Sequence, residues 1–431
     1  MSRRDLHVDV HHITRVEGHG NLVIDVDKGE LKKCELQIVE SPRYFEVLLE
    51  GRPYTEVHHI AGRICGICSI GHTLSSIQAT ERAFGIEATE QTLLLRRLLH
   101  YGEMIQSHAL HAFFLVLPDL FNADSVIPLA ADSPDLVQRA LRIKRFANDL
   151  CAVLAGRHIH PISPVVGGWT SLPDPAALED LARRLDEEIR DDLTVAVDAL
   201  AGLPLPALDR PTENVALVNG DRYPLLSGEI GSSIDPPIVP ADYLDKIEEK
   251  VNPHSSAKHC EGGHGPFMVG ALSRWNLNGD KLRPEALAVA ESLALPRPCD
   301  DPYRITHAQI VEAVDMAYDS GVILARILDE GLVPETVRVE PRAGRGVGAV
   351  EVPRGLLIHD YTYGDDGRVE KANCIIPTGM NLANIEADLR AAVPRLLDLS
   401  EKRIEHELQM LVRAYDPCIS CSTHLLNVVF E

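Results

Sequence analysis

The sequence has few aromatic residues and no long apolar run. Phe, Tyr and Trp make up 5% of its 431 residues, so a core built mainly of Leu, Val, Ala and Ile is expected. No stretch approaches the roughly 20 consecutive apolar residues of a membrane-spanning helix. Arg3-Arg4 resembles the start of a twin-arginine export signal, but the polar segment 5–12 follows where that signal has an apolar run. We therefore expect a soluble, cytoplasmic protein that does not itself span a membrane.

Basic residues are also scarce. The chain has 42 Lys and Arg against 64 Asp and Glu, which leaves a formal net charge of −22. A surface of that sign repels phosphate backbones and argues against nucleic acid as a partner. The overall content of 45% hydrophobic and 25% charged residues is typical of a globular protein.

Cysteine is sparse and unevenly placed. Nine cysteines in a chain of this length are too few for a disulfide scaffold. Five stand alone and are expected to be small buried residues. These are Cys34, Cys151, Cys260, Cys299 and Cys374. The other four form two Cys-x-x-Cys pairs, one at 65–68 and one at 418–421, near opposite ends of the chain.

The hydrophobic pattern predicts a mainly helical protein with small β regions. Alternating residues between positions 7 and 39, and again between 347 and 361, indicate short strands. Periodicity near 3.6 residues predicts helices over most of the rest. The expected helices are Thr73–Phe84, Thr92–Phe114, Pro134–Ala155, Ala176–Leu200, Ala241–Val251, Pro284–Ser292, His307–Leu328 and Asn384–Ala414. Breaks rich in Pro and Gly separate them, and no internal repeat is evident.

These elements predict an α-rich α+β fold in one domain, 1–431. Its expected parts are a β-rich segment 1–60, a helical core 61–424 with both cysteine pairs and a second β region around 345–375, and a short tail 425–431. One domain is expected because a site made from both cysteine pairs needs both ends of the chain.

The two cysteine pairs leave three kinds of site open. Four thiolates can hold a structural zinc, although zinc ribbons place their pairs much closer in sequence. A thioredoxin-type redox pair would account for one pair but not for two. The third possibility is a redox metal with open coordination positions.

Motifs along the whole chain resemble those of nickel–iron hydrogenase large subunits. The segments that carry the resemblance are Arg63–His72, Asp416–His424, Arg15–His19, Tyr44–Glu46, Gly156–Pro161 with Gly167-Gly168, and Pro353–Gly355. They occur in the order found in that family. The short chain and the wording of both cysteine motifs resemble the cytoplasmic, bidirectional branch.

The resemblance implies a nickel–iron centre that interconverts H2 with two protons and two electrons. Cys65 and Cys418 match terminal nickel ligands, and Cys68 and Cys421 match cysteines that bridge nickel to iron. The iron is expected to carry one CO and two cyanides.

Catalytic residues are implied in the same way. Glu17 matches a proton-relay glutamate, and Arg354 matches an arginine above the open metal site. Asp119 and Asp416 match carboxylates placed around that arginine.

Other residues are implied to bind a second ion or to support the centre. Glu46 and His424 match ligands of a magnesium-like ion, with a backbone carbonyl near Cys374 as a further contact. His72 and Pro353 match residues that surround the metal ligands, and Thr378 matches a hydroxyl that hydrogen-bonds a cyanide.

The resemblance also implies partners and a maturation step. Only five scattered cysteines remain, so electrons are expected to leave through an iron–sulfur small subunit and further flavin or iron–sulfur subunits. Family precursors carry a longer extension that is removed after the last histidine, whereas only 425–431 follows here. This tail is expected to be a short propeptide remnant or a retained segment.

Two alternatives remain. One is a hydrogenase-like structural subunit of a quinone-reducing complex, which would have lost the metal ligands. The other is a structural-zinc protein, which would need neither Glu17 nor Arg354.

Overall fold

The computed structural model describes residues 5–219, 222–335 and 337–423. Its helices are α1 (Phe45–Leu49), α2 (Tyr54–Ala61), α3 (Ser69–Phe84), α4 (Glu90–Leu110), α5 (Leu117–Leu120), α6 (Val126–Asp132), α7 (Pro134–Ala155), α8 (Pro175–Arg184), α9 (Arg190–Ala201), α10 (Ala271–Asn278), α11 (Pro284–Ser292), α12 (Ile305–Glu330), α13 (Pro377–Leu396), α14 (Glu401–Ala414) and α15 (Ile419–Ser422). π-helical turns at His111–Val116 and Leu185–Ile189 continue α4 and α8, and 3-10 turns lie at Pro240–Asp245, Gly279–Lys281 and Pro302–Arg304.

Short sheets complete the fold. The strands are β1 (Leu6–Val10), β2 (Gly20–Asp27), β3 (Glu30–Ile38), β4 (Pro164–Val165), β5 (Gly168–Trp169), β6 (Glu213–Val218), β7 (Glu229–Ser232), β8 (Glu248–Lys250), β9 (His259–Glu261), β10 (Phe267–Met268), β11 (Gly344–Val352), β12 (Gly355–Tyr363) and β13 (Val369–Ile375). Two antiparallel three-stranded sheets, β1-β2-β3 and β11-β12-β13, lie where the sequence predicted β structure. The α-rich α+β fold is confirmed.

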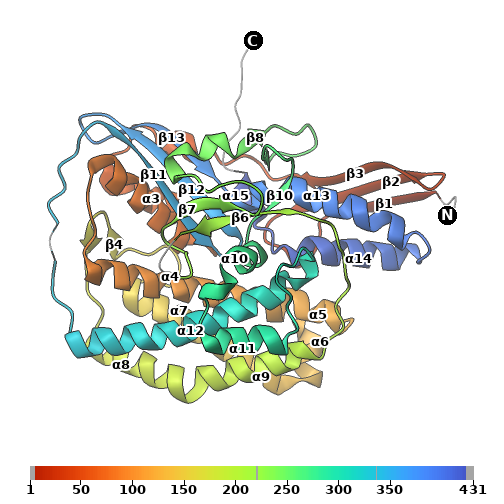
Figure 1. Cartoon of the computed structure of the whole chain (residues 1–431), viewed down its shortest axis with the longest axis horizontal. Coiled ribbons are helices and arrows are strands. Elements are labelled where there is room, and N and C mark those ends of the chain that lie inside the picture. Colours follow the sequence, from red (N-terminus) through yellow and green to blue (C-terminus); the bar gives the residue numbers. More distant parts are fainter. Residues whose placement is uncertain (1–4, 220–221, 336, 424–431) are drawn as a thin grey trace, which may run out of the picture.

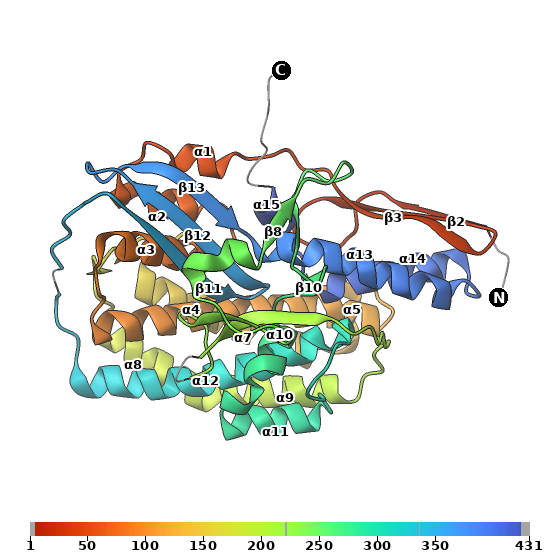
Figure 2. The same cartoon turned by 45° about the horizontal axis from the view of Figure 1, so that its top comes forward.

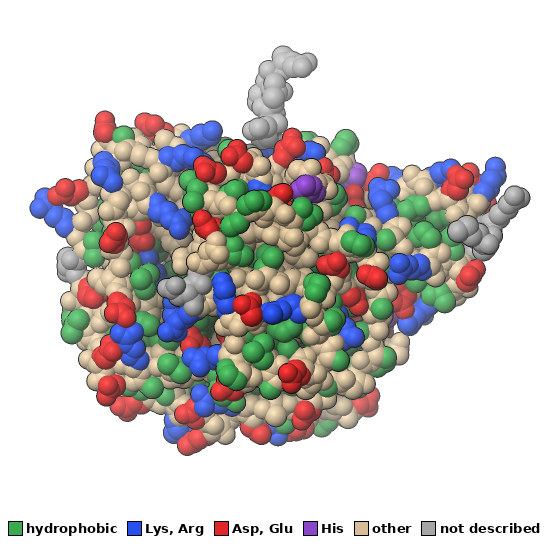
Figure 3. All heavy atoms as spheres, in the orientation of Figure 1, with side chains coloured by type: hydrophobic (Ala, Val, Ile, Leu, Met, Phe, Trp, Pro, Cys, Tyr) green, Lys and Arg blue, Asp and Glu red, His purple; other side chains and the backbone are tan. Residues whose placement is uncertain are grey.

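The elements form layers that bring the two chain ends together. Helices α4, α7, α8, α9, α11 and α12 form a helical layer, and the β11–β13 sheet with α3 lies against it (Figure 1). The N-terminal sheet projects at one end beside α13 and α14, which are close to the other end of the chain (Figure 2). Charged side chains of both signs are scattered over the face shown in Figure 3. None of the helices within the described residues is both long enough and apolar enough to cross a lipid bilayer.

Helix α3 lies unusually close to strand β11. A Cβ atom added at Gly348 would lie 2.0 Å from the carbonyl oxygen of Ser75, which is inside contact distance. Glycine at this position lets the helix backbone approach the strand. The approach matters because α3 begins directly after Cys68 and β11 leads directly to the turn that carries Arg354.

Most predicted helices are confirmed, with two corrections. The segment 241–251 is not a helix, because it ends in β8, which pairs with β9. Tyr243 and Ile247 are four residues apart, a spacing that suggested a helix. Both are buried, but Tyr243 lies in a 3-10 turn and Ile247 lies in a loop. The predicted helix Asn384–Ala414 is two helices, α13 and α14, separated at 397–400.

Candidate metal centre

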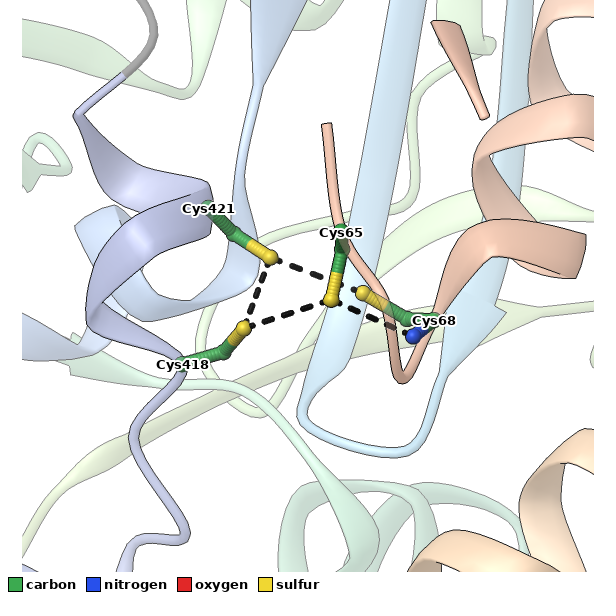
Figure 4. Close-up of side chains that lie close together, drawn as sticks. All are labelled: Cys65, Cys68, Cys418 and Cys421. Carbon is green, nitrogen blue, oxygen red and sulfur yellow. Dashed lines mark hydrogen bonds between the residues drawn. The ribbon is translucent and has the colours of Figure 1, made fainter. Parts of the chain in front are cut away.

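The two cysteine pairs meet at one buried point. Cys65 lies in the loop between α2 and α3, and Cys418 lies directly before α15. The Sγ atoms of Cys65 and Cys418 are 3.5 Å apart, and those of Cys68 and Cys421 are 3.6 Å apart. All four sulfurs lie within 4.8 Å of one another (Figure 4). Four sulfurs this close together have the spacing of ligands that share one metal site.

The surroundings of the sulfurs favour a bound cation. None of the four cysteines is more than 4% exposed. Backbone N–H groups of Ile67 and Cys68 donate to the Cys65 sulfur, each at 3.2 Å, and neighbouring thiols lower the pKa of Cys65. Burial raises the pKa of Cys421 well above its usual range. Several buried thiolates can coexist only beside positive charge, so the donor set fits a thiophilic metal.

Glu17 lies against the second cysteine pair. Its backbone pairs with Cys418 in an isolated parallel bridge, and its carbonyl accepts the N–H of Ile419 at 2.9 Å. Its carboxylate is 3.2 Å from the Cys418 sulfur and accepts the N–H of Ser420 at 3.0 Å. The carboxylate is therefore within proton-transfer distance of a sulfur in the cluster.

Arg354 reaches the cluster from the tip of a hairpin. Pro353 and Arg354 form the two-residue turn between β11 and β12, with Val352 paired to Gly355. Gly355 has φ +132°, and a Cβ there would lie 2.5 Å from a methyl carbon of Val269. Glycine therefore permits the turn that aims the arginine at the sulfurs.

Protein atoms accept hydrogen bonds from only some of the N–H groups of the Arg354 guanidinium. It is 4% exposed and donates from Nε to the Asp416 carbonyl at 2.6 Å and from Nη2 to the Asp416 carboxylate at 2.8 Å. Its Nη1 is buried and has no hydrogen-bond partner among the described residues. Burial by itself would lower the pKa of Arg354, but Asp416 and the nearby thiolates raise it well above its usual range, so the guanidinium stays charged. A buried donor without an acceptor fits an anionic ligand of the centre.

A buried arginine, Arg274, holds this hairpin from behind. The residue is fully buried, and its Nη1 donates to the Glu351 carboxylate at 2.9 Å and to the Val352 carbonyl at 3.0 Å. Its Nε and Nη2 donate to both carboxylate oxygens of Glu312. This ion-pair group was not predicted, because nothing local in a sequence marks an arginine as buried.

Asp119 is held by two arginines other than Arg354. Its carboxylate accepts from Arg413 at 2.7 and 2.9 Å and also from Arg15. Its place near Arg354 stays a prediction. The pairing joins α5, which carries Asp119, to α14, which carries Arg413. Asp119 thus ties the segment before Glu17 to the helix that leads to Cys418.

Glu46 and Cys374 lie together, although their contact is through the backbone N–H of Cys374 and not through the carbonyl that the resemblance implies as an ion ligand. Glu46 is 3% exposed, and its carboxylate accepts the backbone N–H of Cys374 at 2.8 Å. His424, predicted to share an ion with them, lies outside the described residues, as does the predicted tail 425–431. Glu46 therefore offers a buried carboxylate for a hard cation.

His72 and Thr378 support the cysteine loops. His72 is fully buried, and its Nδ1 lies 2.9 Å from the Nε2 atom of His359. The Thr378 hydroxyl oxygen accepts the N–H of Cys418 at 2.9 Å. This bond leaves the hydroxyl hydrogen free to donate to another group.

Glu103 is a buried neighbour of the first cysteine pair that was not predicted. The residue is fully buried in α4, and its two carboxylate oxygens accept the N–H groups of Ile70 at 2.7 Å and Gly71 at 3.0 Å. These amides belong to the first turn of α3, directly after Cys68. Burial raises the pKa of Glu103 to about 8, although the two N–H bonds oppose that shift. In the sequence, the only sign of this residue's role is a glutamate placed within the apolar pattern of a predicted helix.

Glu103→Gln is expected to change how stability depends on pH. The folded chain holds this proton up to about pH 8, whereas the ordinary pKa is 4.5, so the folded state binds more protons between these values. Glu103 therefore lowers stability as pH rises through this window, by up to about 1.4 kcal/mol per pH unit. Glutamine does not ionise, so the melting temperature of the variant should improve relative to wild type between pH 5 and 8. A constant difference across that range would contradict this assignment.

The fold and the site together define a protein with a candidate metal centre, formed by four cysteines from the two ends of one chain. Comparisons with known proteins identify its family. The family model described as nickel-dependent hydrogenase matches residues 43–138 and 322–424, and a HoxL-like model matches residues 7–41.

Similar proteins cover nearly the whole chain. Sulfhydrogenase 1 subunit alpha of Pyrococcus furiosus is 34% identical over 99% of this chain and 100% of its own. NAD-reducing hydrogenase HoxS subunit beta of Cupriavidus necator is 27% identical over 96% of this chain and 94% of its own. A crystal structure of an NAD+-reducing [NiFe]-hydrogenase superposes with a TM-score of 0.87 at 30% identity, covering 97% of this chain and 99% of that one.

The chain belongs to the nickel-dependent hydrogenase family, as the large, catalytic subunit of such an enzyme. The resemblance seen in the sequence is confirmed.

Proposed function

We propose that this chain holds a nickel–iron centre with one CO and two cyanides and catalyses reversible oxidation of H2 to two protons and two electrons. The observation that carries the proposal is the meeting of four buried cysteines with Glu17 and Arg354. Cys65 and Cys418 would be terminal nickel ligands, and Cys68 and Cys421 would bridge to iron. When bound, the centre supplies the redox and Lewis-acid chemistry that splits H2.

The protein residues around the centre would handle charge and protons. Arg354 would place its unpartnered Nη1 toward an anionic ligand and keep positive charge above the open site. Asp416 orients this guanidinium through two hydrogen bonds. Thr378 would donate its hydroxyl hydrogen to a cyanide. Glu17 would accept a proton at the Cys418 sulfur and return one in the reverse direction.

Glu17→Gln is expected to slow proton transfer while leaving the metals in place. The amide cannot accept a proton, yet it keeps the size and one acceptor oxygen of the carboxylate. Exchange between H2 and D2O should fall by about 10²- to 10⁴-fold. Nickel and iron contents should match wild type.

Glu40→Gln provides a matched control for this prediction. Glu40 accepts from the His19 ring at 3.1 Å and lies close in space to the same N-terminal segment. The variant should exchange at the rate of the wild type. Unchanged exchange in Glu17→Gln would mean that protons take another route.

Electrons would leave through an iron–sulfur small subunit and further flavin or iron–sulfur subunits. The five remaining cysteines do not join a metal-binding group anywhere in the described chain. Exposed apolar side chains flank the cysteine loop, including Tyr44 and Ile159, which are 41% and 37% exposed. Their neighbours Arg43 and His160 bond to the backbone of Ile64 and Gly62 within this loop. We propose this face as the docking surface of the small subunit.

The remaining proposals concern the second ion and the organisation of the chain. Glu46, with His424 and a backbone carbonyl near Cys374, would bind magnesium or a similar divalent ion. His72 and Pro353 would support the ligands from behind. The whole chain would act as one domain in a cytoplasmic complex.

An infrared spectrum of the purified native complex tests the proposed centre. One CO band and two cyanide bands, together with one nickel per chain, are expected. A single zinc without these bands would support the structural-zinc alternative. A metal-free protein that stays inactive within its complex would support a structural subunit.

A further inference from the structure

A second group of potential metal ligands lies apart from the cysteine cluster. His254, His259 and Glu386 each place one donor atom within 4.8 Å of the others. His254 lies in the loop between β8 and β9, His259 begins β9, and Glu386 comes from α13. Two imidazoles and one carboxylate are a recurrent ligand set for zinc with an open fourth position.

His259 lacks a partner that a metal would supply. The residue is 4% exposed, and its Nε2 has no hydrogen-bond partner among the described residues. Its Nδ1 lies 3.3 Å from the side-chain amide of Asn252. An asparagine can present either its nitrogen or its oxygen to this atom, and the oxygen would accept from Nδ1 while Nε2 binds metal.

Glu386 and His254 are already in contact. The Nε2 atom of His254 lies 2.7 Å from one Glu386 oxygen, and the same oxygen accepts the N–H of Leu36 at 2.9 Å. In the proposed site the second carboxylate oxygen would bind the ion. Ligand atoms around a tetrahedral zinc lie about 3.3 Å apart, so a small rotation of these side chains would be enough.

The cluster lies beside a pocket, and the positively charged side chains that line this pocket are bonded to other groups. The pocket has a volume of about 410 Å³ and is lined by His259, Glu386 and Arg390 among others. Arg390 donates to the Cys34 carbonyl at 2.8 Å, and Lys250 at the pocket wall is paired with Glu261 at 2.6 Å. Water in this pocket could fill an open coordination position.

We propose that His254, His259 and Glu386 form a zinc site that clamps α13 to the β8–β9 loop and, through Leu36, to β3. The clamp bears on the metal centre because α13 also carries Thr378, which accepts the N–H of Cys418. The site would hold these elements together, with water as its fourth ligand, and it is distinct from the four-cysteine centre and from the proposed ion at Glu46.

Zinc binding to the intact purified complex tests this site. The complex is dialysed against a chelator, equilibrated with buffered Zn²⁺ and analysed for zinc, nickel and iron. The wild-type complex should contain one more zinc ion per chain than the His259→Gln or Glu386→Gln variant. The affinity for zinc at this site should be at least about 100-fold weaker in these variants. X-ray absorption at the zinc edge should show two imidazole ligands in wild type.

His264→Gln provides the matched control, because His264 is exposed and its ring lies 3.0 Å from Asp235, outside the cluster. It should bind zinc like wild type. If the buried-site variants fail to assemble, His254→Gln decides the result, because the His254 side chain is 18% exposed. The proposal would be overturned if wild type and all variants had the same zinc content. It would also be overturned if His264→Gln lost as much zinc as the variants of the proposed ligands.

Discussion

Cys421→Ser is expected to abolish both metal retention and hydrogenase activity. The substitution removes one of four clustered sulfurs, the one 3.6 Å from Cys68 and 2.7 Å from Cys418. A serine hydroxyl is a poor ligand for a thiophilic metal and does not ionise readily in a buried site. Nickel content should fall, and H2 oxidation with a dye acceptor should drop by at least about 100-fold.

Cys299→Ser separates loss of the centre from a general effect of replacing a buried thiol. Cys299 is 6% exposed and belongs to neither pair. This variant should retain its nickel and its activity. A fully active Cys421→Ser enzyme with normal nickel content would overturn the assignment of the four cysteines as ligands.

Arg354→Lys is expected to lower kcat by about 10²- to 10³-fold with nickel and iron retained. Lysine keeps the positive charge, but its single ammonium cannot reproduce the guanidinium fork. In wild type, Nε and Nη2 are held by Asp416 while Nη1 stays unpartnered among the described residues. A lysine held by Asp416 would therefore leave the open site without its oriented donor. Steady-state H2 oxidation and metal analysis on the same samples measure both effects.

Arg345→Lys on the same hairpin is the control. Arg345 lies near the start of β11, at the opposite end of the hairpin from its turn, and its side chain is 44% exposed. It donates to Asp360 at 3.0 and 2.9 Å. Its replacement should leave kcat unchanged. A wild-type kcat in Arg354→Lys, with both metals present, would mean that the guanidinium geometry contributes nothing to turnover.

The site was predictable only in part from the sequence. The cysteines, Glu17, Arg354 and Glu46 stand in short motifs, so their resemblance to a family follows from the order of residues alone. Glu103 and Arg274 have no such motif, and their importance comes from full burial. Asp119 was matched to a family carboxylate from the sequence, but its pairing with Arg413 depends on how α14 packs.

Secondary structure was likewise predictable where its signal is local and not where it depends on distant segments. The helix Pro134–Ala155 was predicted with the bounds of α7, because its apolar periodicity and its Pro and Gly ends are local signals. The segment 241–251 was misassigned because β8 exists only through pairing with β9. Strand pairing between separate segments leaves little trace in a local pattern.

The order of residues specifies which chemical groups are available: two thiol pairs, a glutamate beside a glycine and an arginine after a proline. Thiolate chemistry follows from residue type, so a site for a thiophilic metal could be inferred, but the cysteine pattern alone did not choose between a structural zinc and a redox metal. Which of these groups meet depends on the tertiary fold. The fold brings the sulfurs of Cys65 and Cys418, 353 positions apart in the chain, to 3.5 Å, and it gathers His254, His259 and Glu386. The physical reason is that burial and contact arise from close packing between elements that are distant in the chain.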